Sequence, residues 1–265
     1  MTITESRGNV LVVSPHPDDE SIGAPVTLHK LQEAGFHVVN FAVSLGRPAD
    51  HARRRAELEE ACDRASFGLI VPEDFAKISG GDDMDIAQCH IAGSLSEVMT
   101  DLDPVVTVSP SVWDNHHGHE VVARGTRDAL ETSRKGARWM MYGLWGALPY
   151  PNIYTAFGQT ELDTAIHNLG AYEGEVTRND YRQMVTGTAI LGSVLGTETI
   201  FGFGAAAVSE EPYAELLTEA VHTDRWLQTA PCVFDVSNPL PQDLSGKSLQ
   251  AWTHTKSPYQ EFREQ

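Results

Sequence analysis

The stretch Asn9 to Glu20, NVLVVSPHPDDE, decides the fold of this chain. Its first six residues form a short apolar run, as expected for a strand that is buried on both faces. Polar residues follow at once, which places them at the carboxyl end of that strand. In an open parallel sheet, ligands bind in the crevice outside the carboxyl ends of the strands. The segment from His16 to Glu20 is therefore predicted to lie in a functional site.

Strand and helix patterns alternate along the rest of the first half. Further buried strands are predicted at residues 37–45, 105–109 and 139–144. Helices are predicted at residues 21–34, 53–65, 86–102 and directly after His119. Pro25 either begins the first helix or kinks it. This alternation predicts an α/β fold, with a mostly parallel sheet that is flanked by helices and wound by right-handed crossovers.

The second half of the chain has a less regular pattern. Residues 149–157 are predicted to form a loop, and helices are predicted at residues 160–170 and 179–195. An apolar stretch covers residues 199–208, and the proline-rich segment from Gln228 onward is predicted to wrap the surface as a tail. The length of 265 residues suits one large α/β domain, so we expect residues 1–265 to form a single domain.

Composition and charge exclude several classes of partner. The chain has 19 basic and 37 acidic residues, a net charge of −18, which argues against binding to nucleic acid or to anionic lipid. No apolar run approaches the roughly 18 residues of a membrane span, and the N-terminus is polar. Three cysteines without a CxxC pattern favour a reducing cytoplasm. We expect a cytoplasmic protein with a small-molecule substrate. The sequence does not decide between a monomer and a homo-oligomer.

The cluster after the first strand carries one imidazole and three carboxylates within five residues. His16 and Asp19 lie three residues apart on a predicted tight turn, so they could converge on one metal ion, while Asp18 would point elsewhere. The alternative is helix capping, because acidic residues at a helix N-terminus satisfy free N–H groups. Capping explains the carboxylates but gives no role to His16 or to the two prolines.

A second cluster, WDNHHGHE at residues 113–120, follows the strand predicted at 105–109. Three of the eleven histidines of the chain fall within four positions here. Neighbouring parallel strands lie about 4.8 Å apart, so loops from two strands that are close in the sheet could supply ligands to one site. His16, Asp19 and His119 would give three protein ligands and leave an open position for water, which is the form of a catalytic zinc site.

Two further residues of these clusters have predicted catalytic roles. Asp18 would lie beside the metal without ligating it, and could take a proton from the bound water as a general base. His116 could face the carbonyl under attack and, if protonated, stabilise the oxyanion or protonate the leaving amine.

These segments resemble the sequence motifs of the PIG-L/LmbE-like deacetylase superfamily. PHPDDE after the first strand resembles its AHPDDE motif, and His116 and His119 resemble its HxDH motif. Arg54, Glu57 and Leu58 fit an RxxEL pattern that follows the second strand of the family. The resemblance implies a Rossmann-like fold, zinc dependence and removal of N-acyl groups, usually acetyl from an amino sugar. It assigns the metal to His16, Asp19 and His119.

The resemblance also divides the chain and identifies departures from the family pattern. It implies a metal-site half at about residues 1–148 and a substrate-shaping half at about 149–265. Gly118 replaces the aspartate that could orient the first histidine, and Asp114 or Glu120 could compensate. The Gly-Glu that often follows the second strand is Gly46-Arg47 here. Arg54, Asp114 and Trp113 are the candidate substrate contacts, and Arg54 could equally lie on a solvated helix face.

The sequence thus predicts a zinc-dependent N-deacetylase that acts on an N-acetylated amino sugar in small-molecule or natural-product metabolism. One alternative is an amidase on a thiol conjugate or a non-sugar N-acyl compound. Another is a sugar-binding protein without catalytic activity, although binding alone does not require the additional carboxylate of Asp18. No GxGxxG pattern follows the first strand, which argues against a dinucleotide enzyme.

Overall fold

The computed structural model describes residues 6–263 and has the α/β architecture that the sequence predicts. The strands are β1 Asn9–Ser14, β2 His37–Ala42, β3 Gly68–Ile70, β4 Val106–Pro110, β5 Ala137–Tyr142, β6 Ile153–Phe157, β7 Tyr213–His222, β8 Trp226–Thr229, β9 Cys232–Val233 and β10 Leu244–Ser248. The helices are α1 Asp19–Gly23, α2 Pro25–Glu33, α3 His51–Ala65, α4 Met84–Leu102, α5 His117–Ser133, α6 Gln159–Leu169, α7 Glu173–Arg178, α8 Tyr181–Phe201, α9 Gln250–His254 and α10 Pro258–Arg263, and a short 3₁₀ helix spans Pro48–Asp50.

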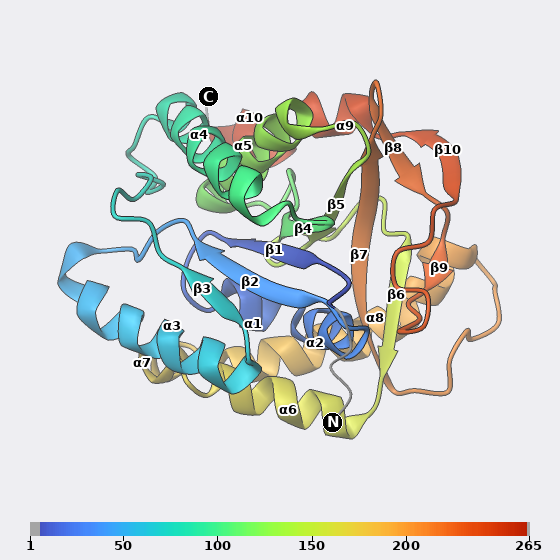
Figure 1. Ribbon diagram of the computed structural model, residues 1–265. Coiled ribbons are helices and arrows are strands. Elements are labelled where there is room, and N and C mark those ends of the chain that lie inside the picture. The colour runs from blue at the N-terminus through green and yellow to red at the C-terminus, as the bar shows by residue number, and fades with distance from the viewer. Residues whose placement is uncertain (1–5, 264–265) are drawn as a thin grey trace.

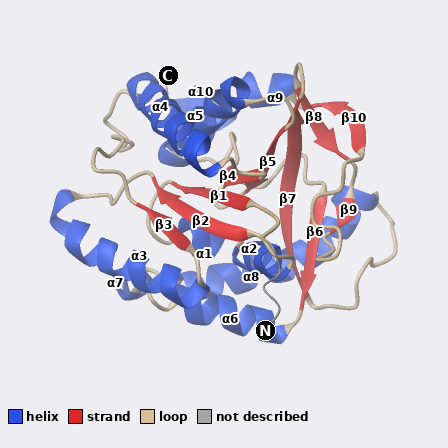
Figure 2. Cartoon of the chain, viewed as in Figure 1, coloured by secondary structure: helices blue, strands red, loops and turns tan. Residues whose placement is uncertain are grey.

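One mixed sheet runs through both halves of the chain. Its main path is β10-β8-β7-β5-β4-β1-β2-β3, and β6 pairs with β7 and β9 beside this path. The five neighbouring strands β3, β2, β1, β4 and β5 are parallel, whereas β7 is antiparallel to β5. Helices cover both faces: α4, α5, α9 and α10 lie on one side of the sheet, and α1, α2, α3, α6 and α8 lie on the other (Figures 1 and 2). The fold therefore has three layers.

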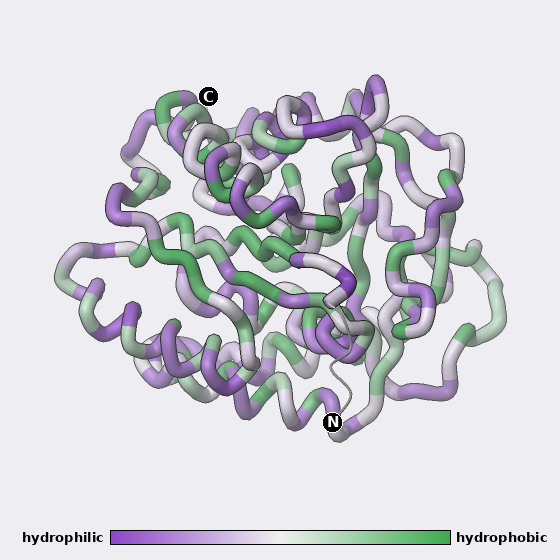
Figure 3. The backbone as a smooth tube through the Cα atoms, in the orientation of Figure 1, coloured by the Kyte–Doolittle hydropathy of each residue, from purple (hydrophilic) through white to green (hydrophobic). Residues whose placement is uncertain are grey.

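The alternation of side chains along β1 explains why both faces are covered. Leu11 and Val13 pack into the core beneath α4 and α5, while Val10 and Val12 pack into the core beneath α2. All four side chains are fully buried. The central strands are accordingly hydrophobic and α3 is largely hydrophilic on the outside (Figure 3). A continuous apolar run is thus the expected sequence of a strand with helices on both faces.

The first half matches the predicted elements closely. β1, β2, β4 and β5 lie within a few residues of the predicted strands, and α3, α4 and α5 within two or three residues of the predicted helices. The first predicted helix is divided at Ala24, whose φ of −155° is extended, and Pro25 occupies the first turn of α2. Proline fits that position because its missing N–H has no partner within the helix there.

The prediction was wrong in several parts of the second half. The segment predicted as a loop contains β6, and the segment predicted as a tail contains β9, β10, α9 and α10. Strand β7, which lies between β5 and β8, was missed entirely. The half-buried Glu215 and the fully buried Glu219 break the apolar pattern of a central strand. Glu215 accepts hydrogen bonds from the backbone of Val26 and Thr27, and Glu219 forms an ion pair with Arg138.

Helix α8 extends beyond its predicted end and includes the start of the apolar stretch at residues 199–208. Among the described residues it is the one helix that is long and apolar enough to cross a membrane by length and composition alone. Only 28% of its most apolar 18 residues are buried inside the protein. A helix was predicted at residues 179–195, but its exposed apolar face was not.

Candidate metal centre

The loop after β1 turns sharply between two carboxylates. Asp19 begins α1, and its Oδ2 accepts a hydrogen bond of 2.8 Å from the backbone N–H of His16. Asp18 has a φ of 110°, a left-handed conformation that is uncommon for a residue other than glycine. Such strain concentrates at functional sites. The turn directs Asp19 toward His16, while Asp18 lines the neighbouring pocket.

The loop after β4 brings the second cluster to the same edge of the sheet. β4 pairs directly with β1, so the two loops emerge side by side, which meets the condition for ligands from both loops to share one site. His116 caps α5, and its Nδ1 accepts a hydrogen bond of 3.4 Å from the backbone N–H of His119. The buried His119 lies one turn into the helix, with its Nε2 3.3 Å from Oδ1 of Asp19.

Three potential ligands converge between these loops. One ligand atom from each of His16, Asp19 and His119 lies within 4.8 Å of the other two. Nδ1 of His16 is 3.3 Å from Oδ2 of Asp19, whereas Nε2 of His119 is 3.3 Å from the other oxygen, Oδ1. Two imidazoles and one carboxylate form a donor set that suits zinc and leaves a coordination position open. These residues therefore form a candidate site for one metal ion.

Asp114 supports this site from behind. Its Oδ2 is 2.8 Å from Nδ1 of His119, which leaves Nε2 of the same ring facing Asp19. Its Oδ1 accepts backbone N–H bonds from Leu144, Trp145 and Gly146. A carboxylate behind a histidine ligand fixes the orientation of the ring and raises its basicity. Asp114 therefore positions both His119 and the loop that follows β5.

This geometry corrects the predicted roles of Asp114 and its neighbours. Asp114 is fully buried behind His119, so it neither faces the pocket nor orients His116. Glu120, the other candidate, accepts hydrogen bonds from the backbone of Asn115 and from Ser257. Trp113 does not line the pocket either, because its ring packs against Trp252 and its Nε1 donates to the carbonyl of Thr255.

The electrostatics of the triad favour an ion pair in the absence of metal. Burial alone would lower the pKa of His119, but the charges of Asp19 and Asp114 outweigh it and raise that pKa to about 10. Burial alone would raise the pKa of Asp19, but His119 and His16 hold it well below its ordinary range. Without metal, His119 thus carries a proton at neutral pH and Asp19 does not.

A small pocket of about 160 Å³ opens over the triad. Its lining consists of His16, Asp18, Asp19, Ile22, Arg54, His116, His119, Trp145 and Tyr181. Burial, followed by the charge of Asp19, raises the pKa of Asp18 well above its ordinary value, and Arg54 opposes this effect. Burial and the neighbouring His119 and His16 lower the pKa of His116 to about 3. His116 is therefore a neutral imidazole at physiological pH.

Arg54 lies at the pocket and not on a solvated face. Its Nε donates a hydrogen bond of 3.1 Å to Glu175, and its Nη1 donates to the carbonyl of Leu45. Glu175 and Tyr181 come from α7 and α8, where the sequence carried no motif to indicate them. Trp145, which the sequence marked only as one of several aromatic residues, lies 6.2 Å from His116 between ring centroids. His117 stacks on the other side of His116, with centroids 4.5 Å apart.

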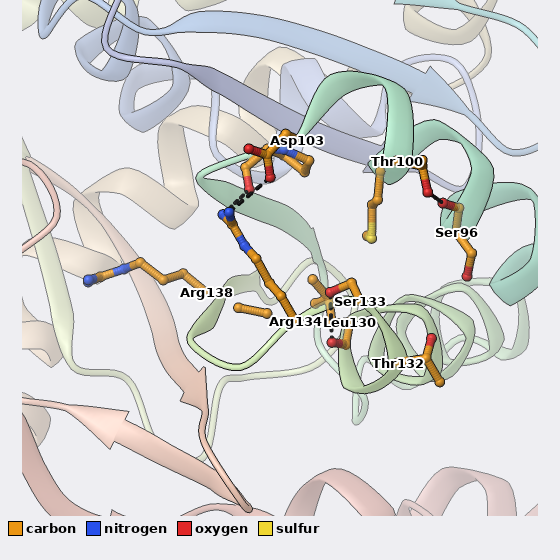
Figure 4. A pocket seen from close by; sticks show the side chains of 11 residues that line it. Ser96, Thr100, Asp103, Leu130, Thr132, Ser133, Arg134 and Arg138 are labelled. Carbon is orange, nitrogen blue, oxygen red and sulfur yellow. Dashed lines mark hydrogen bonds and ion pairs between the residues drawn. The ribbon is translucent and has the colours of Figure 1, made fainter.

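A larger cavity of about 400 Å³ lies at the amino ends of β4 and β5, the opposite edge of the sheet from the triad (Figure 4). Its charged side chains are paired: Arg134 donates to Asp103, and Arg138 to Glu219. None of the metal-ligand clusters among residues 6–263 lies there. The triad, not this cavity, is therefore the candidate site for chemistry.

A comparison with protein-family models finds one match, which covers the triad. The family model for GlcNAc-PI de-N-acetylase, PIG-L, matches residues 11–130, which include all three potential ligands. No curated protein sequence matches the chain.

Solved structures share the fold at low sequence identity. The deacetylase of the A40926 pseudoaglycone has a TM-score of 0.62 at 15% identity, over 86% of this chain and 99% of its own. The zinc-inhibited form of teicoplanin deacetylase has a TM-score of 0.61 at 14% identity, over 82% and 99%. The 4-carboxy-2-hydroxymuconate hydratase of Pseudomonas putida has a TM-score of 0.56 at 17% identity, over 80% and 95%. Because one of these proteins is a hydratase, the fold alone does not determine the reaction.

Proposed function

We propose that this chain, which belongs to the PIG-L/LmbE-like deacetylase family, is a zinc-dependent hydrolase that removes an N-acyl group from an amino sugar. One observation supports the proposal above all. His16, Asp19 and His119 converge on one point, and the unliganded Asp18 and His116 line the same small pocket. A binding protein needs no such additional base and donor beside a metal.

The ion and the side chains would divide the chemistry between them. A bound zinc ion supplies a Lewis acid that polarises a carbonyl and lowers the pKa of water. Asp18 accepts the proton of the attacking water and passes it to the leaving amine. Burial raises its pKa above that of a free carboxylate, and a carboxylate of raised pKa is the stronger base.

His116 stabilises the developing charge as a neutral donor. Because its Nδ1 accepts the hydrogen bond from His119 N–H, the ring proton must sit on Nε2. A neutral Nε2–H can donate to the oxyanion that forms on the carbonyl. The sequence-based expectation was that a protonated His116 would act here. The pKa of about 3 leaves His116 uncharged, so we propose a neutral donor instead.

The test of the proposed function is acetate release from a panel of N-acetylated amino sugars, N-acyl thiol conjugates and N-acyl amino acids. We expect release from the amino sugars with zinc-loaded protein, and none with protein treated with a chelator. Release from the thiol conjugates or amino acids alone would show that the substrate is an N-acyl compound other than an amino sugar. No release from any compound would contradict the proposal.

Zinc binding should release a proton from the protein. With a pKa of about 10, His119 is protonated at pH 7 and must lose that proton before it can ligate. We expect about one proton released per zinc, and an affinity that rises about tenfold per pH unit as the pH approaches 10. Calorimetry in two buffers of different ionisation enthalpy measures this. Zinc binding whose heat is the same in both buffers would contradict the predicted protonation of His119.

Replacing His116 by alanine should keep the metal and lower turnover by about 10²–10³-fold, the usual effect of losing one oxyanion donor. Because the pKa of His116 is about 3, the wild-type pH–rate profile should show no histidine ionisation from this residue between pH 5 and 8. His117→Ala is the control, since that ring lies behind His116 and outside the pocket. Equal losses in the two variants would argue against an oxyanion role for His116.

A further inference from the structure

The RxxEL pattern of Arg54, Glu57 and Leu58 connects α3 to the second half of the chain. The backbone N–H of Gly174, in α7, donates a hydrogen bond of 2.9 Å to Oε1 of Glu57. A side chain at Gly174 would collide with Arg53, because a Cβ there would lie 1.9 Å from its Nη1. Helix α7 therefore packs closely against α3, beside which it lies in Figure 1.

This packing brings one carboxylate of α7 to three arginines. Glu175 is 6% exposed and accepts hydrogen bonds from Arg53, Arg54 and Arg178. Burial alone would raise the pKa of Glu175, but the arginines outweigh it and lower that pKa, so the side chain is ionised at neutral pH. A buried ion pair requires a well-fixed geometry. Glu175 therefore restricts the guanidinium groups that surround it.

Arg54 is the most buried of these arginines and the one that lines the catalytic pocket. Its side chain is 12% exposed, against 40% for Arg53 and 58% for Arg178. Its Nε donates to Glu175, and its Nη1 donates to the carbonyl of Leu45. Its Nη2 has no partner among the described residues, so this nitrogen is the part of the guanidinium that remains for a ligand in the pocket.

Gly46 leaves the room that this arrangement needs. Its φ of 76° is left-handed, a conformation that favours glycine, and a Cβ at this position would lie 2.3 Å from Nη1 of Arg54. A larger residue would displace the guanidinium. The position of Arg54 thus depends on Glu175, which binds it, and on Gly46, which leaves the space free.

We propose that Glu175 is a positioning residue, which holds Arg54 so that its Nη2 donates a hydrogen bond to the substrate in the catalytic pocket. The inference rests on the proposed function, since it assumes that the substrate lies in this pocket. Glu175 is not among the residues that line the pocket, so it acts through Arg54. A guanidinium that is already fixed loses little conformational entropy on binding, and therefore binds more tightly than a mobile one.

The first test separates substrate affinity from turnover. Glu175→Gln keeps the shape of the side chain and removes its charge. It should raise KM for N-acetylglucosamine by about tenfold or more and leave kcat within about threefold, because a contact made equally in the ground and transition states affects KM. Glu173→Gln is the matched control, since Glu173 is exposed at the start of the same helix. Both variants should keep wild-type zinc affinity, because neither residue belongs to the triad.

A double-mutant cycle tests the path through Arg54. Arg54→Met should raise KM at least as much as Glu175→Gln, and the double variant should have the KM of Arg54→Met. Gly46→Ala gives a second route that keeps Glu175, because its methyl group displaces the guanidinium, and it should raise KM by a similar factor. Losses that multiply in the double variant, as they do for independent sites, would overturn the inference. An unchanged KM in Glu175→Gln or, if that variant does not fold, in Gly46→Ala would also overturn it.

A measurement without substrate separates this inference from the proposed function. In wild-type protein, the Nε–H of Arg54 should exchange with water at least about tenfold more slowly than in Glu175→Gln, as NMR of the arginine side chains measures. If this protection is found but no N-acyl sugar is hydrolysed, the proposed function fails and the positioning of Arg54 by Glu175 stands. If N-acetylglucosamine is hydrolysed but the exchange rate is the same in both proteins, the inference is overturned and the proposed function stands.

Discussion

Replacing Asp18 by asparagine should lower turnover by about 10²–10⁴-fold and leave the metal content of the protein unchanged. The carboxylate lines the pocket beside the triad but is not one of its potential ligands. Asparagine has the same shape and, after glycine, is among the residues that best tolerate the left-handed backbone at φ 110°, so the loop should keep its conformation. What it loses is the ability to accept a proton.

Steady-state acetate release and metal analysis of the same preparation measure the two effects together. Asp19→Asn is the matched control, because it makes the same chemical change at the next residue but affects a potential ligand. That variant should lose metal affinity first and turnover as a consequence. Near-native turnover in Asp18→Asn would exclude the base role.

The second large effect is expected at His119 and at the carboxylate behind it. His119→Ala should reduce bound zinc from about one per chain to none at micromolar metal, because it removes a buried ligand. Asp114→Asn should keep the ligand set and lower zinc affinity by about 10–100-fold, the usual cost of losing such a partner. Its Oδ2 lies 2.8 Å from the ring of His119.

Competition with a metal chelator measures both affinities. Trp113→Phe is a suitable control, since Trp113 precedes Asp114 but contacts Trp252 and Thr255 instead of the triad. The order of affinities should be wild type, then Asp114→Asn, then His119→Ala. Wild-type affinity in His119→Ala would remove this residue from the metal site.

The part of the fold that could be predicted is the part whose sequence follows one simple rule. β1 and β4 are continuous apolar runs with polar loops behind them, so their burial and the convergence of His16 with His119 followed from the pattern. β7 could not be found this way, because its two glutamates become compatible with burial only through Arg138 and the backbone of α2. Such pairings between distant segments leave no local periodicity.

The same limit applies to the walls of the site. Glu175 and Tyr181 approach the pocket from α7 and α8, more than 150 residues after Asp18, and no spacing in the sequence connects them. The role of Asp114 was predicted incorrectly for a different reason. Its position next to the histidine cluster is evident in the sequence, but one turn of α5 separates His116 from His119, and the carboxylate reaches the second ring. Which of two nearby imidazoles it serves depends on the backbone of the loop.

The most direct test of the central claim is a titration of metal-free protein with zinc, followed by acetate release from the best amino-sugar substrate. The rate should rise from near zero in proportion to added zinc, up to about one equivalent per chain, and His119→Ala should show no such rise. A rate that is independent of zinc, or one restored equally in His119→Ala, would contradict hydrolysis at this site.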